Sequence, residues 1–232
     1  MEEAVEGEGG VGVLEEGLNL EEIVKDSAFE SSPQSSNKLA SNYITGSEDA
    51  YVEGALAVIY HEDKKSGELE FYLETKSPTY SFTKFAGKNA LVGGVIDPTD
   101  KSPHSALVRE INEEIQGDGA KILERIARDN PTPYHIEEHD SNGVPVRDYV
   151  FKLEIKDDNE WETVKNSSMT NDAGFRTILT RNDIADSNEG DWAFNHYNLI
   201  SKFINDNQNY RSLDDSSRSN FSNYLDSIRL PL

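Results

Sequence analysis

The sequence predicts an α/β fold, in one domain that spans residues 51–206. Three observations lead to this prediction. Short apolar or alternating segments, which are typical of strands, lie on both sides of one strongly periodic helix, and a second periodic helix closes the region. The chain has 232 residues, which is enough for one domain of ordinary size with polar extensions.

The start of this region predicts a strand hairpin followed by a short third strand. Residues 55–60 form a continuous apolar run, which is typical of a buried strand. Residues 69–75 roughly alternate between apolar and polar side chains, and a polar, turn-like stretch separates the two segments. Residues 91–96 form a brief apolar stretch that is interrupted by Gly93 and Gly94.

The clearest helix is predicted over residues 103–116. Ser102 is a suitable N-cap, because its hydroxyl can accept a hydrogen bond from a backbone N–H of the first turn. Pro103 suits the first helical position, and Gly117 is a stop signal. A second helix is predicted over residues 120–128.

The remainder predicts a second hairpin, two weaker strands and a closing helix. The hairpin joins residues 134–139 to residues 144–155 around an Asn-Gly turn. The weaker strands are predicted at residues 161–165 and 175–179. The closing helix is predicted over residues 191–205, where apolar side chains recur at helical spacing.

Both ends of the chain differ from the middle in composition. Residues 1–50 carry twelve acids and two lysines, with few aromatic side chains, so we expect a disordered acidic tail. Residues 207–232 are polar and form a C-terminal extension. A short amphipathic helix is predicted within it from Phe221, Tyr224, Leu225 and Ile228.

Composition excludes several classes of function. The chain has 44 acids, 22 lysines and arginines and a formal net charge of −22, which argues against binding to long nucleic acids or anionic lipids. It has no cysteine, which excludes thiol catalysis and cysteine-ligated metals. No apolar run approaches the roughly 20 residues of a membrane span, and no secretory signal is evident. We therefore expect a soluble, cytoplasmic protein.

Two sectors of the helix at residues 103–116 carry different chemistry. One sector is apolar, and it consists of Leu107, Val108, Ile111 and Ile115. The other sector carries three acids, Glu110, Glu113 and Glu114. Like charges at i, i+4 are destabilising, and clustered carboxylates suit a hard cation such as Mg²⁺. A solvated acidic face in an acidic protein explains the helix alone equally well.

The loop before this helix favours a functional interpretation. Gly94 is followed after five residues by Asp100 and then, after eight more, by Arg109-Glu-Ile-Asn-Glu-Glu114. This segment resembles the Nudix box, G-x5-E-x7-R-E-U-x-E-E-x-G-U, in which U is a bulky aliphatic residue. The resemblance covers roughly residues 51–206. It implies a Nudix-type α/β/α sandwich with a mixed sheet.

The segment departs from the family pattern at three points. The loop between Asp100 and Arg109 holds one residue more than the pattern, and Asp100 stands where the pattern has glutamate. Gln116 occupies the position of the late glycine. These differences leave the carboxylates of the helix intact, so we expect activity to be retained.

The resemblance implies metal-dependent hydrolysis of a pyrophosphate bond in a nucleoside diphosphate linked to another moiety, X. Carried over by position, Glu110 and Glu114 are the main ligands of Mg²⁺ or Mn²⁺, and Glu113 completes the cluster. The backbone carbonyl of Gly93 is a further ligand candidate. Arg109 orients Glu110 through a charge-assisted hydrogen bond. The expected partner is a small nucleotide.

A general base outside the box is a further expectation from the family. Glu154, on the predicted strand at residues 144–155, is the first candidate, with Glu137 and Glu138 as alternatives; an exposed strand carboxylate is the competing interpretation for each. Aromatic residues before the box, Tyr80, Phe82 and Phe85, could stack on a nucleobase or pack in the core. The sequence His135-Ile-Glu-Glu-His139 fits a zinc-peptidase pattern, but residues 134–139 predict a strand rather than the helix that this chemistry needs.

Two other classes of function stay open. A non-catalytic Nudix domain could bind a nucleotide or a protein partner, and an acidic tail could bind a basic partner. The sequence does not specify the X moiety or the oligomeric state.

Overall fold

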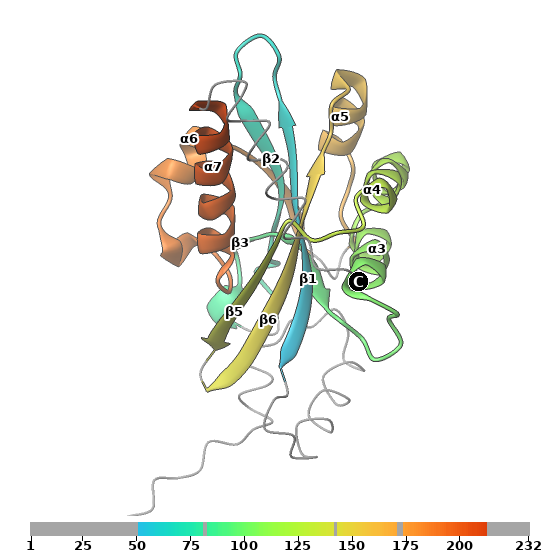
Figure 1. Ribbon diagram of the computed structural model, residues 1–232, viewed down its shortest axis with the longest axis vertical. Helices are drawn as coiled ribbons and strands as arrows, with labels where there is room; N and C mark the ends of the chain where they lie inside the picture. The colour runs from blue at the N-terminus through green and yellow to red at the C-terminus, as the bar shows by residue number, and fades with distance from the viewer. Residues whose placement is uncertain (1–50, 81–82, 142, 171–173, 213–232) are drawn as a thin grey trace, which may run out of the picture.

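In the computed structural model, which describes residues 51–80, 83–141, 143–170 and 174–212, a seven-stranded mixed sheet lies between two layers of helices. Figure 1 shows the sheet edge-on, with α3, α4 and α5 on one side and α6 and α7 on the other. This arrangement confirms the predicted α/β/α sandwich.

The central strand of the sheet is β1, which contacts three neighbours. The order is β3-β2-β1-β6-β5, while β4 also pairs with β1 and β7 pairs with β2. β1 is antiparallel to β2 and β4 and parallel to β6. The strands are β1 (Val52–Glu62), β2 (Leu69–Thr75), β3 (Asn89–Ala90), β4 (Val92–Val95), β5 (His135–Ser141), β6 (Val144–Glu154) and β7 (Phe175–Thr180).

The helices divide the apolar side chains into two clusters, one on each face of the sheet. On β1, Ala55 and Ala57 face one cluster, whereas Leu56 and Val58 face the other. Because β1 is buried on both faces, it is almost continuously apolar. One face is covered by α3 (Pro103–Glu114), α4 (Asp118–Asp129) and α5 (Asp158–Lys165), and the other by α6 (Arg181–Asp186) and α7 (His196–Ser212). Two 3-10 turns, η1 (Thr83–Phe85) and η2 (Glu189–Asp191), lie between these elements.

The hydrogen bonds at the start of α3 confirm the predicted N-cap, Ser102. The Ser102 hydroxyl accepts a hydrogen bond from the Ser105 N–H, the Ser105 hydroxyl accepts one from the Ser102 N–H, and Pro103 opens the helix. The helix ends at Glu114, two residues earlier than predicted, because Ile115 is extended and forms a bridge with Met169. Both predicted hairpins are also confirmed.

Two predicted elements differ in the structure. Residues 161–165 were predicted as a strand, but they belong to α5, which Asp157 caps by accepting hydrogen bonds from two N–H groups. Trp161 and Val164 bury one face of this helix, so its apolar spacing is helical. The closing helix begins at His196 rather than at residue 191, because η2 and a left-handed Phe194 (φ 55°) precede it.

Two predictions lie outside the described residues, namely the disordered tail at residues 1–50 and the amphipathic helix near residues 221–228. Within the described residues, no helix has both the length and the apolar character that crossing a membrane requires.

Candidate functional site

The predicted box acids occupy the side of α3 that faces strand β4. Glu110 is fully buried, and Glu114 is buried with 7% of its surface exposed. Half of the Glu113 side chain is exposed. Leu107 and Ile111 anchor the same helix in the core. A solvated acidic face would leave all three acids in water, so burial of two of them argues against that interpretation.

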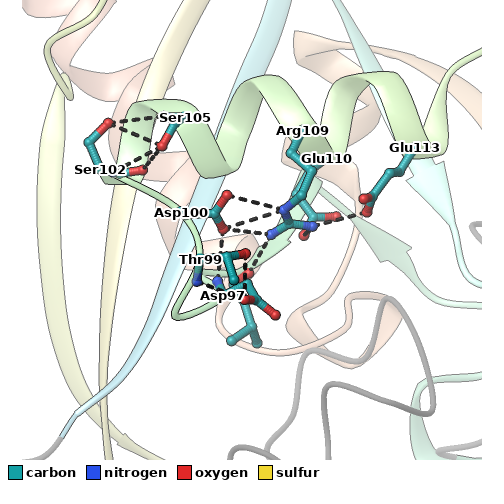
Figure 2. A network of polar contacts seen from close by, with 9 residues as sticks. Asp97, Thr99, Asp100, Ser102, Ser105, Arg109, Glu110 and Glu113 are labelled. Carbon is teal, nitrogen blue, oxygen red and sulfur yellow. Dashed lines mark hydrogen bonds and ion pairs between the residues drawn. The ribbon is translucent and has the colours of Figure 1, made fainter.

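Arg109 holds the acids of the loop and the helix together (Figure 2). Its Nη1 donates to Glu110 Oε1 at 2.7 Å and to Glu113 Oε2 at 2.9 Å. Its Nη2 donates to Asp100 Oδ2 at 3.0 Å and to the carbonyl oxygen of Val95 at 2.9 Å. One guanidinium therefore fixes Glu110 relative to the end of β4.

Asp100 reaches Arg109 despite the longer loop and the shorter side chain. A tight turn folds the loop back, since the Asp97 N–H donates to Asp100 Oδ2 and the Asp100 N–H donates to the Asp97 carbonyl. The carboxylate of Asp100 is thereby placed against the Nε and Nη2 atoms of Arg109. Asp100 and Arg109 therefore form an ion pair although the loop is one residue longer than the family pattern and carries aspartate instead of glutamate.

The glycine pair in the middle of β4 allows close approach of backbone and carboxylates. A Cβ on Gly94 would lie 2.7 Å from Glu110 Oε1, so a side chain there would displace the carboxylate. Gly93 has φ +133°, and its Cβ would lie 2.1 Å from the carbonyl oxygen of Ala55. The Gly93 N–H donates to Glu114 Oε2 at 3.1 Å.

Glu74 at the end of strand β2 and Lys76 just after it are two residues that the sequence interpretation missed. Glu74 is fully buried, and its Oε2 accepts a 2.6 Å ion-paired hydrogen bond from Lys76 Nζ. Glu74 Oε1 has no hydrogen-bond partner among the residues that the structure describes. The signal for this pair was the alternation of β2, which places Glu74 on the same face as Tyr72, a member of the core under α3.

Burial makes the charged forms of these acids costly. Burial raises the pKa of Glu110 to about 7, although Arg109 opposes the shift. Burial also raises the pKa of Glu114, with the charge of Glu74 acting in the same direction. The pKa of Glu74 is raised by burial and lowered in part by Lys76. Three buried carboxylates thus share Lys76 and Arg109, and a further cation would favour their charged forms.

The chemistry of this cluster fits a hard divalent cation, because its donors are carboxylate and carbonyl oxygens with an excess of buried acid. The described residues nevertheless include no group of three His, Asp or Glu side chains already arranged to hold a metal ion. In the structure, Arg109, Lys76 and the Gly93 N–H supply the contacts to these carboxylates. The cluster therefore fits a divalent cation in the type of its donor atoms and in its charge, and its side chains are arranged around Arg109 and Lys76.

The structure does not bring Glu154 to this cluster. In the register of β1 and β6, Glu154 lies opposite Tyr60, whereas Gly94 lies opposite Ala55. Five residues of strand correspond to about 16 Å. Side chains alternate along β6, so Glu154 is on the face of Val150, away from α3. It lies 3.8 Å from Lys156 and is partly exposed.

The two alternative bases also have other partners. Glu138 pairs with Arg147 at 2.8 Å, and Glu137 lies 2.6 Å from His135. Residues 135–141 form strand β5, which confirms the strand predicted for the His-x-x-Glu-His pattern.

Asp148, on the face of the sheet that α7 covers, is a second buried acid that the sequence interpretation missed. It is 1% exposed, and its Oδ1 has no hydrogen-bond partner among the described residues. Burial raises its pKa to about 7, and the charge of Glu137 adds to the shift. His139 Nδ1 lies 3.8 Å from Asp148 Oδ2.

Replacing Asp148 with asparagine should stabilise the protein at pH 8 and change little at pH 4. A raised pKa means that the folded state binds the proton more tightly than the unfolded state. The wild-type free energy of unfolding therefore falls as pH rises from about 4 to 7, by about 2–4 kcal/mol from this group. Urea unfolding at both pH values measures the difference, with the exposed Asp129→Asn as control. An Asp148→Asn variant that is no more stable than wild type at pH 8 would contradict this.

Several solved structures are similar to this chain in fold. The chain is similar to a bifunctional NMN adenylyltransferase/ADP ribose pyrophosphatase from Francisella tularensis, with 13% identity and a TM-score of 0.50 over 73% of this chain and 45% of that chain. It is also similar to a mutT/nudix family protein from Listeria innocua (18% identity, TM-score 0.47, 71% of this chain and 97% of that one). A third similar structure is the NUDIX domain of Shewanella oneidensis NrtR in complex with ADP ribose (15% identity, TM-score 0.44, 71% and 96%).

These likenesses concern the fold. No protein-family model matches the sequence, and no curated protein matches it. The mixed sheet between two layers of helices is shared with the Francisella structure, and the Listeria and Shewanella structures are described as Nudix proteins.

Proposed function

We propose that this protein hydrolyses a pyrophosphate bond in a nucleoside diphosphate linked to another moiety, with the aid of Mg²⁺ or Mn²⁺. The observation that carries the proposal is the pair of buried carboxylates, Glu110 and Glu114, one turn apart on α3 and against Gly93 and Gly94. Burial of like charges is unfavourable for the fold alone, so a cation-dependent function is the best explanation.

In this proposal some residues bind the metal, and others position those ligands. Glu110, Glu114 and the backbone carbonyl of Gly93 would hold the metal, and the half-exposed Glu113 would complete the site. Arg109 positions Glu110, and Asp100 in turn holds Arg109. When bound, the metal supplies screening between carboxylates and diphosphate, polarises a phosphoryl oxygen and lowers the pKa of water. Glu154 has no part in the proposal, since it lies on the other face of the sheet.

The proposal also draws support from the fold. The Francisella protein of the same fold is described as an ADP ribose pyrophosphatase. The proposed substrate class, nucleoside diphosphate derivatives, is broader than ADP-ribose, because the box residues would bind the metal and the diphosphate and would not contact the X moiety.

One observation favours a second candidate function, a non-catalytic domain that binds a nucleotide. Lys76 already lies among the carboxylates, at 2.6 Å from Glu74, and supplies part of the charge that a metal would provide. A site neutralised in this way could bind a ligand without turning it over.

A substrate panel separates the two candidates. The purified protein is incubated with Mg²⁺ and with ADP-ribose, dinucleoside polyphosphates, nucleotide sugars and nucleoside triphosphates, and products are identified by mass. The proposal predicts release of a nucleoside monophosphate or of diphosphate products from at least one compound, and loss of this release with EDTA. Binding of a nucleotide without turnover of any compound would favour the non-catalytic candidate.

A further inference from the structure

The His-x-x-Glu-His sequence of residues 135–139 groups different side chains on a strand than it would on a helix. Side chains alternate along β5, so His135, Glu137 and His139 share one face, while Glu138 points to the other. The three residues of the shared face are partly buried, whereas Glu138 is exposed. The strand therefore places two imidazoles and one carboxylate on one face, and these are ligand types of Zn²⁺ and related cations.

A further carboxylate reaches this face from the neighbouring strand. In the antiparallel register of β5 and β6, Asp148 lies directly opposite Glu137, and Val146 lies opposite His139. Directly opposed residues of an antiparallel pair project to the same face, with their Cβ atoms about 5 Å apart. This face carries Val146 and Val150 and belongs to the side of the sheet that α7 covers. Glu137, His139 and Asp148, which we call the β5–β6 cluster, therefore lie on the side of the sheet opposite the box.

Two atoms of the β5–β6 cluster, Asp148 Oδ1 and His139 Nδ1, are buried and have no hydrogen-bond partner among the described residues. Asp148 is 1% exposed, and burying a carboxylate without a partner is costly. His139 Nδ1 lies 3.8 Å from Asp148 Oδ2, which is too long for a hydrogen bond. Zn²⁺ binds nitrogen and oxygen at about 2.0–2.1 Å, so one ion can contact two atoms that are up to about 4.1 Å apart. The separation of these two side chains therefore fits an ion between them.

Glu137 is the third candidate ligand, and His135 orients it. His135 Nε2 lies 2.6 Å from Glu137 Oε2, so Oε1 is the oxygen that a cation would use. Ligating carboxylates are commonly held by such a contact, which fixes their orientation. As placed, these side chains do not form a finished group of three ligands in the described part of the chain, so binding requires Glu137 to turn toward the other two. A side-chain rotation is sufficient, because Glu137 and Asp148 already lie opposite each other.

We propose that Glu137, His139 and Asp148 form a second metal site, for Zn²⁺ or a similar first-row transition cation. Imidazole suits such cations, whereas the all-oxygen ligands of the box suit Mg²⁺ or Mn²⁺. An ion at this site would fasten β5, the outer strand of the sheet, to β6 beside it (Figure 1). The inference goes beyond the proposed hydrolysis and does not depend on it.

Isothermal titration with Zn²⁺ at pH 7.5 tests this inference. Wild type should bind Zn²⁺ at a site that Asp148→Asn and His139→Phe each weaken about tenfold or more, because each variant removes one ligand. Asp148→Asn keeps the shape of the side chain and should be at least as stable as wild type, so its loss of affinity reports the ligand and not unfolding. The matched control is Glu138→Gln, which removes a carboxylate from the other face of the same strand and should leave the affinity unchanged.

Variants of the two sites distinguish the β5–β6 cluster from the box. Glu110→Gln should leave the Zn²⁺ affinity of the cluster unchanged, and Asp148→Asn should leave the tightest Mn²⁺ site unchanged. Loss of the Zn²⁺ site in Glu110→Gln would overturn the inference, because the ion would then belong to the box. Equal Zn²⁺ affinity in wild type, Asp148→Asn and His139→Phe would overturn it as well. The substrate panel tests the proposed function independently of these results.

Discussion

Replacing Glu110 or Glu114 with glutamine is expected to lower kcat by about 10³-fold, because metal-assisted phosphoryl chemistry contributes several kcal/mol and each 1.36 kcal/mol corresponds to a factor of ten. Glutamine keeps the shape of the side chain and removes the charge that would hold the cation. Glu113→Gln should have a smaller effect, about tenfold, since half of that side chain is in solvent.

The loss of activity should occur without loss of folding. Burial raises the pKa of Glu110 to about 7, so at pH 8 its charged form is unfavourable and glutamine should maintain or increase the free energy of unfolding. Steady-state kinetics and thermal melts on the same samples measure both effects. Glu124→Gln, at a partly exposed position of α4 where the acid pairs with Arg128, serves as control. Wild-type kcat in Glu110→Gln and Glu114→Gln would exclude the assigned roles.

Replacing Arg109 with methionine should reduce the free energy of unfolding by about 3 kcal/mol at pH 8. Removing one partner of a buried ion pair leaves the other charge uncompensated, and Glu110 has no solvent exposure. At pH 5 the loss should be smaller, because Glu110 then binds a proton and no longer needs the guanidinium.

Urea unfolding at the two pH values measures the effect of Arg109→Met. The matched control is Arg125→Met, whose ion pair with Glu160 is largely exposed, and which should cost less than about 1 kcal/mol at either pH. If Arg109→Met destabilises the protein no more than Arg125→Met, the ion pair of Arg109 and Glu110 contributes no more than an exposed one. That result would contradict the role of Arg109 in positioning Glu110.

Local patterns were sufficient to predict the scaffold of the site. The cap at Ser102, the apolar spacing of Leu107 and Ile111 and the two glycines each act over a few residues, and the structure has α3 and β4 as these patterns indicate. Arg109 contacts Glu113 four residues later, so that contact follows from helical geometry. Its contact with Glu110 joins adjacent residues, and it requires both side chains to turn toward β4.

Residues brought in from distant segments could not be predicted in the same way. The charge of Glu74 acts on Glu114 because the Glu74 side chain, on β2, points to the face of the sheet that α3 covers, and Glu154 lies away from the cluster because of the parallel register of β6 with β1. The alternation of β2 indicates the face on which Glu74 lies, but no local pattern shows which helix covers that face or how β6 is aligned with β1. The error at α5 had a local cause, since the N-cap at Asp157 and the Trp161–Val164 spacing outweigh the strand propensity of that segment.

Direct binding of Mn²⁺ is the measurement closest to the central claim, that Glu110 and Glu114 hold a divalent cation. Electron paramagnetic resonance at pH 8 quantifies free Mn²⁺ during titration with protein. Because a protein of net charge −22 binds cations weakly over its whole surface, the decisive comparison is between wild type and single-charge variants. We predict that Glu110→Gln and Glu114→Gln each weaken the tightest site at least tenfold, whereas Glu124→Gln leaves it unchanged. Equal Mn²⁺ affinity in all four proteins would contradict the account.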